Sequence, residues 1–247
     1  MMSIDLTAAP PRRTVRATAA WMLTVHLYVA AWFWALAIVV VGLAIVVINL
    51  LGQVSTSIVA FSQQGALWFP FSMFIGVTAA YLPVHVAAGL TRRTMSLGAL
   101  IAAVVTGLVY GAVFGALLLI ERALFGALGW HWRILDSVSA ADTGALDFVV
   151  ASALTFVVAY VSGLLVCLTY QRVGGWWGTL ALPLTAGPIF AVSALFARDT
   201  GPFSTATWFG GAQPLLVATV VTVVLVAAMG LVFDRLTRGA AVPTRTS

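Results

Sequence analysis

Six long apolar segments without a charged side chain constrain the fold of this 247-residue chain more than any other feature. They cover residues 29–51, 66–89, 97–120, 148–170, 176–196 and 214–233. Bilayer hydrocarbon is about 30 Å thick and a helix rises about 1.5 Å per residue, so each segment is long enough for one crossing. Barrel strands are about half this length and alternate between polar and apolar residues. The sequence therefore predicts an all-α polytopic membrane protein with six transmembrane helices.

The composition excludes a water-soluble fold and several enzyme classes. The chain is 62% hydrophobic and 8% charged, whereas about 25% of residues are charged in soluble domains. It contains no lysine, so its 12 Lys and Arg residues are all arginine. A P-loop ATPase needs a lysine at the phosphates and a Schiff-base enzyme needs a lysine amine. Neither chemistry can be carried by this chain.

The distribution of arginine predicts the orientation in the membrane. With the N-terminus in the cytoplasm, the outside loops contain three arginines and the inside segments contain the other nine: Arg12, Arg13, Arg16, Arg92, Arg93, Arg172, Arg235, Arg238 and Arg245. This bias follows the positive-inside rule and places both termini in the cytoplasm. It also explains the net charge of +5, so we expect no nucleic acid partner.

The segments outside the six spans complete the predicted organisation. The apolar stretch from residue 17 to residue 51 is too long for one crossing, so residues 1–28 are expected to form a cytoplasmic segment with an interfacial helix. Residues 29–233 form the transmembrane domain and residues 234–247 a cytoplasmic tail. The outer segment 121–147 is expected to hold another short interfacial helix.

Side chains suited to catalysis or metal binding are scarce. Ser162 lacks the glycine two residues earlier that an intramembrane serine protease motif requires. The one glutamate, Glu121, follows Ile120 rather than a histidine, which excludes an H-E-x-x-H metalloprotease. The histidines are expected at span ends and in an outer loop, apart from one another: His26, His85 and His131. We therefore predict no catalytic residue, no metal site and no cofactor in this chain.

A glycine repeat in the third apolar segment predicts a close helix contact. Gly107, Gly111 and Gly115 recur every four residues and form a flat strip on one face of a helix. Such a strip lets another helix backbone approach closely. The partner helix can belong to the same chain or to a second copy.

Two prolines predict a kink in the fifth apolar segment. Pro183, Gly187 and Pro188 lie within seven consecutive residues, and prolines are a common cause of helix kinks. These residues are a candidate functional hinge. The alternative is that they are ordinary prolines, which membrane helices tolerate.

The connection between the second and third segments carries a short basic motif. This connection is expected to run from Leu90 to Ser96, and Gly89 precedes it. The order of features along the chain resembles the membrane subunit of ABC-2 type ABC transporters. Those permeases have six spans, cytoplasmic termini, an interfacial helix before the first span, and a G-x-[ST]-R-[RK] type segment that docks into the ATPase. The matching residues here are Gly89, Leu90, Thr91, Arg92 and Arg93.

This resemblance implies a function, and two alternatives stay open. A permease subunit of an ABC exporter would form the translocation pathway, pair with a second permease copy or a paralogue, and depend on ATP bound by a separate ATPase subunit. It would lie in the cell membrane, as in the inner membrane of bacteria. The alternatives are an ion-coupled secondary transporter, which the absence of charge in the spans disfavours, and a membrane assembly or immunity module without transport activity.

Overall fold

The computed structural model describes residues 11–52, 56–132, 145–196 and 214–239, and these residues form helices and turns without any strand. Five helices in the described part are long and apolar enough to cross a membrane. They are α1 (Pro11–Leu51), α2 (Ser62–Ala87), α3 (Arg92–Ala127), α4 (Ala145–Leu180) and α8 (Leu215–Arg238). The predicted all-α class is confirmed for these residues.

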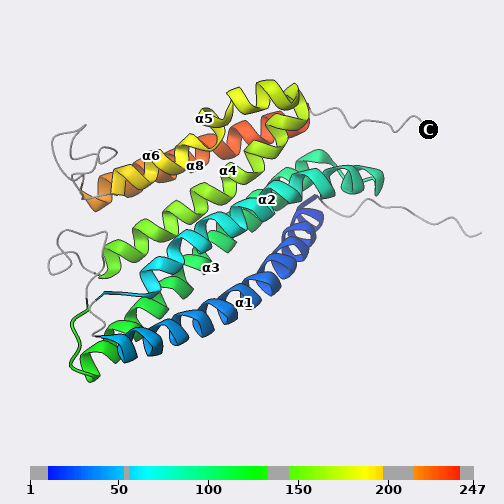
Figure 1. Cartoon of the computed structure of the whole chain (residues 1–247). Coiled ribbons are helices and arrows are strands. Elements are labelled where there is room, and N and C mark those ends of the chain that lie inside the picture. The colour runs from blue at the N-terminus through cyan, green and yellow to red at the C-terminus, as the bar shows by residue number, and fades with distance from the viewer. Residues whose placement is uncertain (1–10, 53–55, 133–144, 197–213, 240–247) are drawn as a thin grey trace, which may run out of the picture.

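The fifth predicted segment forms shorter helical pieces. The backbone of α4 breaks at Gly174, where φ is 80° and ψ is 177°. Beyond this kink the chain turns back through the last residues of α4, α5 (Leu182–Thr185) and α6 (Gly187–Phe196), which lie alongside the first part of α4 (Figure 1). The predicted connection between the fourth and fifth segments is thus a sharp kink at a glycine, which tolerates this left-handed conformation.

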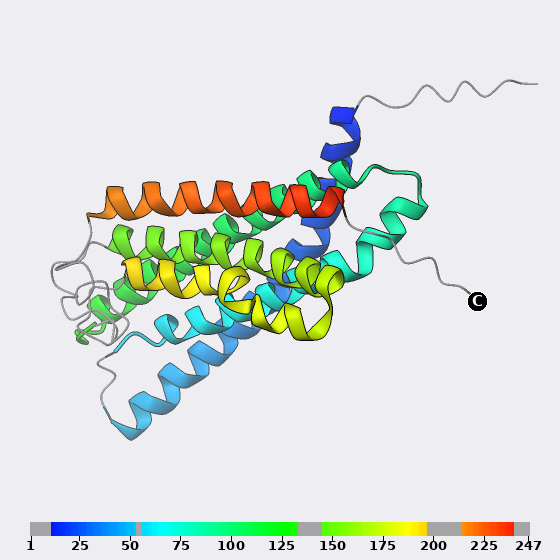
Figure 2. The same ribbon diagram turned by 90° about the horizontal axis from the view of Figure 1, so that it is seen from above.

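Successive segments run in alternate directions between the two ends of the bundle. The start of α1, the turn from α2 to α3, the kink in α4 and the end of α8 lie together at one end (Figures 1 and 2). Six described arginines lie in these parts of the chain: Arg16, Arg92, Arg93, Arg172, Arg235 and Arg238. We call this the basic end. The opposite end is formed by the 3-10 helix η1 (Val59–Phe61), the end of α3, the start of α4 and the start of α8.

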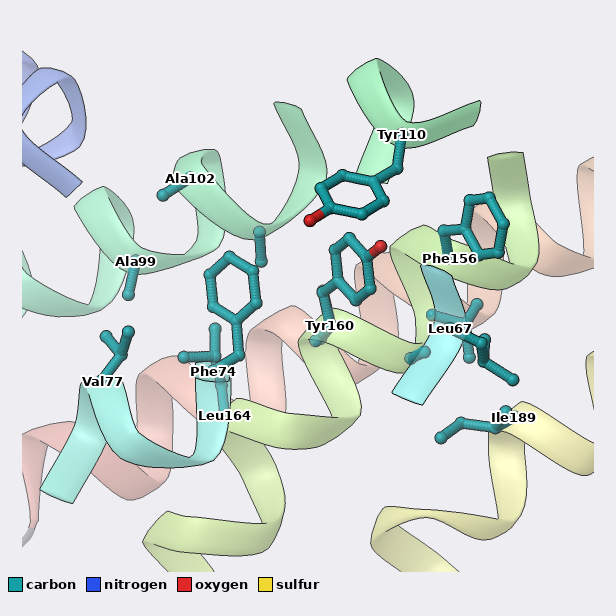
Figure 3. Packing of buried hydrophobic residues seen from close by; sticks show 14 of the residues in the cluster. Leu67, Phe74, Val77, Ala99, Ala102, Tyr110, Phe156, Tyr160, Leu164 and Ile189 are labelled. Carbon is teal, nitrogen blue, oxygen red and sulfur yellow. The ribbon is translucent and has the colours of Figure 1, made fainter. Parts of the chain in front are cut away.

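Helix α4 lies in the centre of the bundle. Residues 155–168 are all buried, so every face of this part of α4 is covered by protein. Helices α2, α3, α6 and α8 pack around it. An apolar helix without a polar face suits this position. Figure 3 shows how Phe156, Tyr160 and Leu164 of α4 pack towards Phe74 of α2 and Tyr110 of α3 in the shared core.

Helix α1 forms one uninterrupted helix, so the expected break between an interfacial helix and the first span is absent. Its first half packs mainly against α3, and Met22, Ala30 and Trp34 are buried there. From Leu36 onwards most of its large apolar side chains are exposed. The helix bends as it leaves the bundle (Figure 1). The length of the apolar stretch predicts a turn between two helices, but the structure has a single curved helix instead.

The outer segment also differs from its prediction. Residues 121–127 continue α3, which ends at Ala127, so no separate helix begins at Glu121. Gly129 then adopts a φ of 70°, and the N–H of Trp130 donates to the carbonyl of Phe125 over 2.8 Å. This arrangement resembles the glycine-ended helix termini that satisfy free carbonyls. Residues 133–144 lie outside the described part of the chain.

Candidate functional site

The basic motif lies at a tight turn between α2 and α3. Gly89 adopts a φ of 74° just after α2 ends, and the N–H of Leu90 donates to the carbonyl of His85 over 3.1 Å. Thr91 caps α3, since its hydroxyl oxygen accepts a hydrogen bond from the N–H of Thr94 over 3.2 Å. The expected connection from Leu90 to Ser96 is therefore wrong in extent. The helix already begins at Arg92, and the link between the helices is only four residues long.

Arg92 and Arg93 therefore occupy the first turn of α3 rather than a loop. The first turn contains no acidic residue. Positive charge at a helix N-terminus opposes the helix dipole, at a cost of about 0.3–1 kcal/mol per charge. Helix stability alone therefore does not favour these two arginines. Arg93 is exposed and Arg92 is partly buried.

The end of α8 provides hydrogen-bond acceptors and a carboxylate near this positive charge. Arg92 Nη1 donates to the backbone carbonyl of Arg238 at the end of α8 over 3.2 Å. Ser96 donates to Asp234 Oδ1 over 2.6 Å, and the other oxygen of Asp234 lies 2.5 Å from Arg238 Nη2. Asp234 is 8% exposed. The N-terminus of α3 is thus joined to the C-terminus of α8 by a buried carboxylate and a carbonyl.

A further arginine comes from α4. Arg172 lies against Gly239 at the end of α8, so closely that an added Cβ there would collide with its guanidinium. Arginines from α3, α4 and α8 consequently gather around one helix terminus. The charge distribution predicts the cytoplasmic side for all of these arginines but does not reveal the roles of Ser96 and Asp234. The spacing of Asp234 and Arg238, which are four residues apart in a helix, was the available signal.

The glycine strip lies at a close contact between α3 and α4. A Cβ added at Gly107 would lie 2.8 Å from the backbone of Val157, and one added at Gly111 would lie 2.7 Å from Ala153 Cα. One added at Gly115 would lie 2.7 Å from a methyl of Val149. The opposing residues of α4 are also four apart. Of the two alternatives, the structure has the contact within one chain.

The proline-rich segment interrupts the helix that follows α4. Ala181 separates the end of α4 from α5, and Ala186 separates α5 from α6. Pro183 lies in the first turn of α5, and Gly187 and Pro188 begin α6. The predicted kink is therefore present as two short interruptions. Motion about a hinge at Pro183, Gly187 and Pro188 stays a prediction.

Glu121 is a buried acid that holds several segments together, a role that its sequence context does not predict. It is 3% exposed at the end of the bundle opposite the basic end. Its Oε1 accepts hydrogen bonds from the N–H groups of Ile58 and Val59 over 2.7 and 3.0 Å. Its Oε2 accepts from the hydroxyl of Ser57 and from Trp132 Nε1. One carboxylate thereby ties the connection before α2 and the segment after α3 to α3 itself.

The histidines lie in different environments. His26 was expected near a cytoplasmic end, but it is buried in the core and stacks on Phe74 of α2, with 4.3 Å between the ring centroids. His85 lies in the last turn of α2, near the basic end. His131 is exposed after α3. Within the described residues, no three His, Cys, Asp or Glu side chains form a group that could hold a metal ion.

Comparison with known proteins gives no family for this chain. No family model, no curated protein and no solved structure matches it. Its function is therefore inferred from the sequence and from the geometry of the described residues.

Proposed function

We propose that the chain is the membrane-spanning permease subunit of an ABC-type exporter and is driven by a separate ATPase subunit. In this proposal the chain crosses the cell membrane six times, the broken segment 176–196 forms the fifth span, and the basic end faces the cytoplasm. The ATP is held by the partner. A second permease copy or a paralogue completes the translocation pathway.

The observation that carries the proposal is the position of the basic turn. Residues 88–91 form a tight, exposed turn, and exposed Arg93 follows at the start of α3. The neighbouring Arg92 is bonded to the end of α8, and Ser96 is bonded to Asp234. A partner that displaces this turn would move α3 and α8 together. These contacts would let the turn transmit a movement of the partner to α3 and α8, as a coupling element must.

The charge of the basic end also fits a docking role. Arginine presents a planar set of donors that matches carboxylates and helix-end carbonyls of a partner protein. Placing arginine in the first turn of α3 costs helix stability, which a docking or topogenic role would offset. An ATPase that binds one conformation of the turn more tightly than another would shift the bundle between the two.

Exposed Arg93 provides the cleanest test. The tagged full chain is purified from its source cells in mild detergent, and the co-purifying proteins are identified and assayed for ATP hydrolysis. We expect a P-loop ATPase in stoichiometric amount. We also expect Arg93→Lys, which keeps the topogenic charge but loses the planar donor set, to weaken this association and the hydrolysis several-fold.

Arg235→Lys is the matched control, because Arg235 is another exposed arginine at the same end. Arg92 and Arg238 are unsuitable controls, since their substitution would also disturb the contact between α3 and α8. Purification without any ATPase would refute the proposal. Unchanged association and hydrolysis in Arg93→Lys and Arg93→Ala would remove the turn from the coupling role and leave its charge only topogenic.

A further inference from the structure

Aromatic ring pairs bridge α1 and α2. We call this contact the aromatic seam and define it by three pairs in antiparallel register: Trp21 with Tyr81, His26 with Phe74, and Phe33 with Phe69. Their ring centroids are 4.7, 4.3 and 5.3 Å apart. Close backbone approach between α1 and α2 is rare, whereas α1 packs extensively against α3. The rings therefore hold α1 to α2 across a wide spacing.

The hydrogen bond of His26 shows which ring nitrogen carries a proton. His26 Nδ1 lies 2.7 Å from the backbone carbonyl oxygen of Met22. A carbonyl only accepts hydrogen bonds, so Nδ1 carries a proton. In the neutral ring the other nitrogen, Nε2, is then an unprotonated lone pair. Nε2 is buried and has no hydrogen-bond partner within the described part of the chain, and the whole residue is only 4% exposed.

Among the residues that the structure describes, none offers His26 a counter-ion. Phe74 covers one face of the imidazole. The charged residue of α1 nearest to His26 is Arg16. Helix α2 contains no Asp, Glu, Lys or Arg, and α3 has none between Arg93 and Glu121. The central helix α4 has none between Asp147 and Arg172.

The titratable side chains in the ring stack around His26 are phenols, and the buried thiol of Cys167 lies two turns further along α4. Phe74 also stacks on Tyr160 of α4, and Tyr110 of α3 contacts Trp34 of α1. Phenols are neutral near pH 7 and below. Thr78 lies one turn beyond Phe74 on α2 and is likewise buried with an unpartnered oxygen. A second proton on His26 would therefore create a buried cation without an anionic partner among the residues described.

We propose that His26 is a proton-binding site in the aromatic seam, and that proton uptake at Nε2 opens the seam between α1 and α2. A proton from solvent bonds to the Nε2 lone pair and converts the neutral imidazole into an imidazolium. A buried charge without a partner is unfavourable, so the protonated state favours an arrangement in which water reaches the ring. This inference is independent of any ATPase partner.

Helix α1 can separate from α2 while it stays attached to α3. Thr18 contacts Gly98 of α3 so closely that a Cβ at that glycine would lie 2.7 Å from the threonine methyl. In contrast, the seam consists of ring pairs that can separate individually. Opening would expose the side of α1 that carries His26 and leave the close contact with α3 in place. Protonation of His26 would then be coupled to the separation of α1 from α2.

Spin-label distances between α1 and α2 test the opening. Nitroxides are placed at Tyr28→Cys and Ala80→Cys, two exposed positions, in a Cys167→Ala background of the full chain in lipid nanodiscs. Between pH 8 and pH 5 we expect the mean distance to increase by about 2 Å or more, the scale of helix shifts in switching proteins. His26→Phe keeps a ring against Phe74 but binds no proton, so its distance should not change.

Nitrogen NMR of the histidine rings tests protonation directly. At pH 8 the His26 signals should show the tautomer with a proton on Nδ1, and by pH 5 both nitrogens should be protonated. The signals are assigned by their loss in His26→Phe, or in His26→Leu if the first variant does not fold. A His85→Phe control should keep the transition. A His26 ring that stays neutral at pH 5, an unchanged distance in the wild type, or an equal change in His26→Phe would overturn the proposal.

Discussion

Removing the Glu121 carboxylate should destabilise the bundle strongly, because this group is the shared acceptor of four donors. In Glu121→Ala, two backbone N–H groups, the Ser57 hydroxyl and the Trp132 indole all lose their acceptor. A hydrogen bond to a charged group contributes about 1.5–3 kcal/mol, and a buried donor left without an acceptor costs about 1–3 kcal/mol. These contributions share one carboxylate and do not add fully. We expect the free energy of unfolding to fall by about 3–5 kcal/mol, which is more than one unsatisfied donor costs and less than the sum of all four.

Two milder variants separate the contributions of individual hydrogen bonds to this loss of stability. Glu121→Gln keeps one acceptor oxygen, which can still serve the N–H groups of Ile58 and Val59, but its amide nitrogen would face the indole N–H of Trp132. We expect about 1–3 kcal/mol of destabilisation. Trp132→Phe removes a single donor and leaves the carboxylate with its other three partners, so about 1 kcal/mol is expected. The predicted order of stability is therefore wild type, Trp132→Phe, Glu121→Gln and Glu121→Ala.

Equilibrium unfolding by steric trapping in bicelles measures these free energies in a lipid environment. Each variant is compared with the wild type under the same lipid composition and temperature. If Glu121→Ala lies within about 1 kcal/mol of the wild type, the carboxylate is not the organising group of this end of the bundle. Equal effects of Glu121→Gln and Glu121→Ala would show that the negative charge, rather than the set of hydrogen bonds, is what matters.

The remaining predictions concern helix packing and orientation. Gly111→Leu should cost about 1–3 kcal/mol by overpacking the contact with α4, whereas Ala112→Leu on the exposed neighbouring position should be nearly neutral; equal melting temperatures would contradict the glycine strip. In a cysteine-free background, an Ala88→Cys variant should react with an impermeant maleimide only after cells are permeabilised, and His131→Cys should react in intact cells. The reverse pattern would invert the proposed topology.

The apolar spans and the charge distribution are the parts of this fold that sequence alone reveals. Long charge-free runs predict the helices because lipid cannot satisfy free backbone groups. The ends of the helices are less visible: α3 begins at Arg92 rather than at residue 97 and continues to Ala127 rather than ending at residue 120. Hydropathy reports where side chains leave the hydrocarbon, while hydrogen bonds such as the Thr91 cap determine where the helix begins.

The polar contacts within the bundle depend on partners that are distant in sequence. Glu121 and Ser57 are 64 residues apart, and Ser96 and Asp234 are 138 residues apart. Their residue types alone indicate only that they lie near span ends. His26 is similar, because its position in the apolar stretch suggests an interface and only its contact with Phe74 places it in the core. The glycine strip was more informative, since a spacing of four residues has a direct geometric meaning on a helix.

The two kinds of contact in this bundle differ in how easily they can move. Between α3 and α4 the glycine strip brings backbones together, and Gly163 of α4 likewise lies against the backbone of Phe71 of α2. Closely packed interfaces have low compressibility and transmit displacement, so α2, α3 and α4 should move as one unit. The aromatic seam to α1 and the interrupted segment 176–196 lack this restraint along their lengths. A conformational change in this protein should therefore pivot α1 about its close contact with α3 and displace the interrupted segment relative to the three central helices.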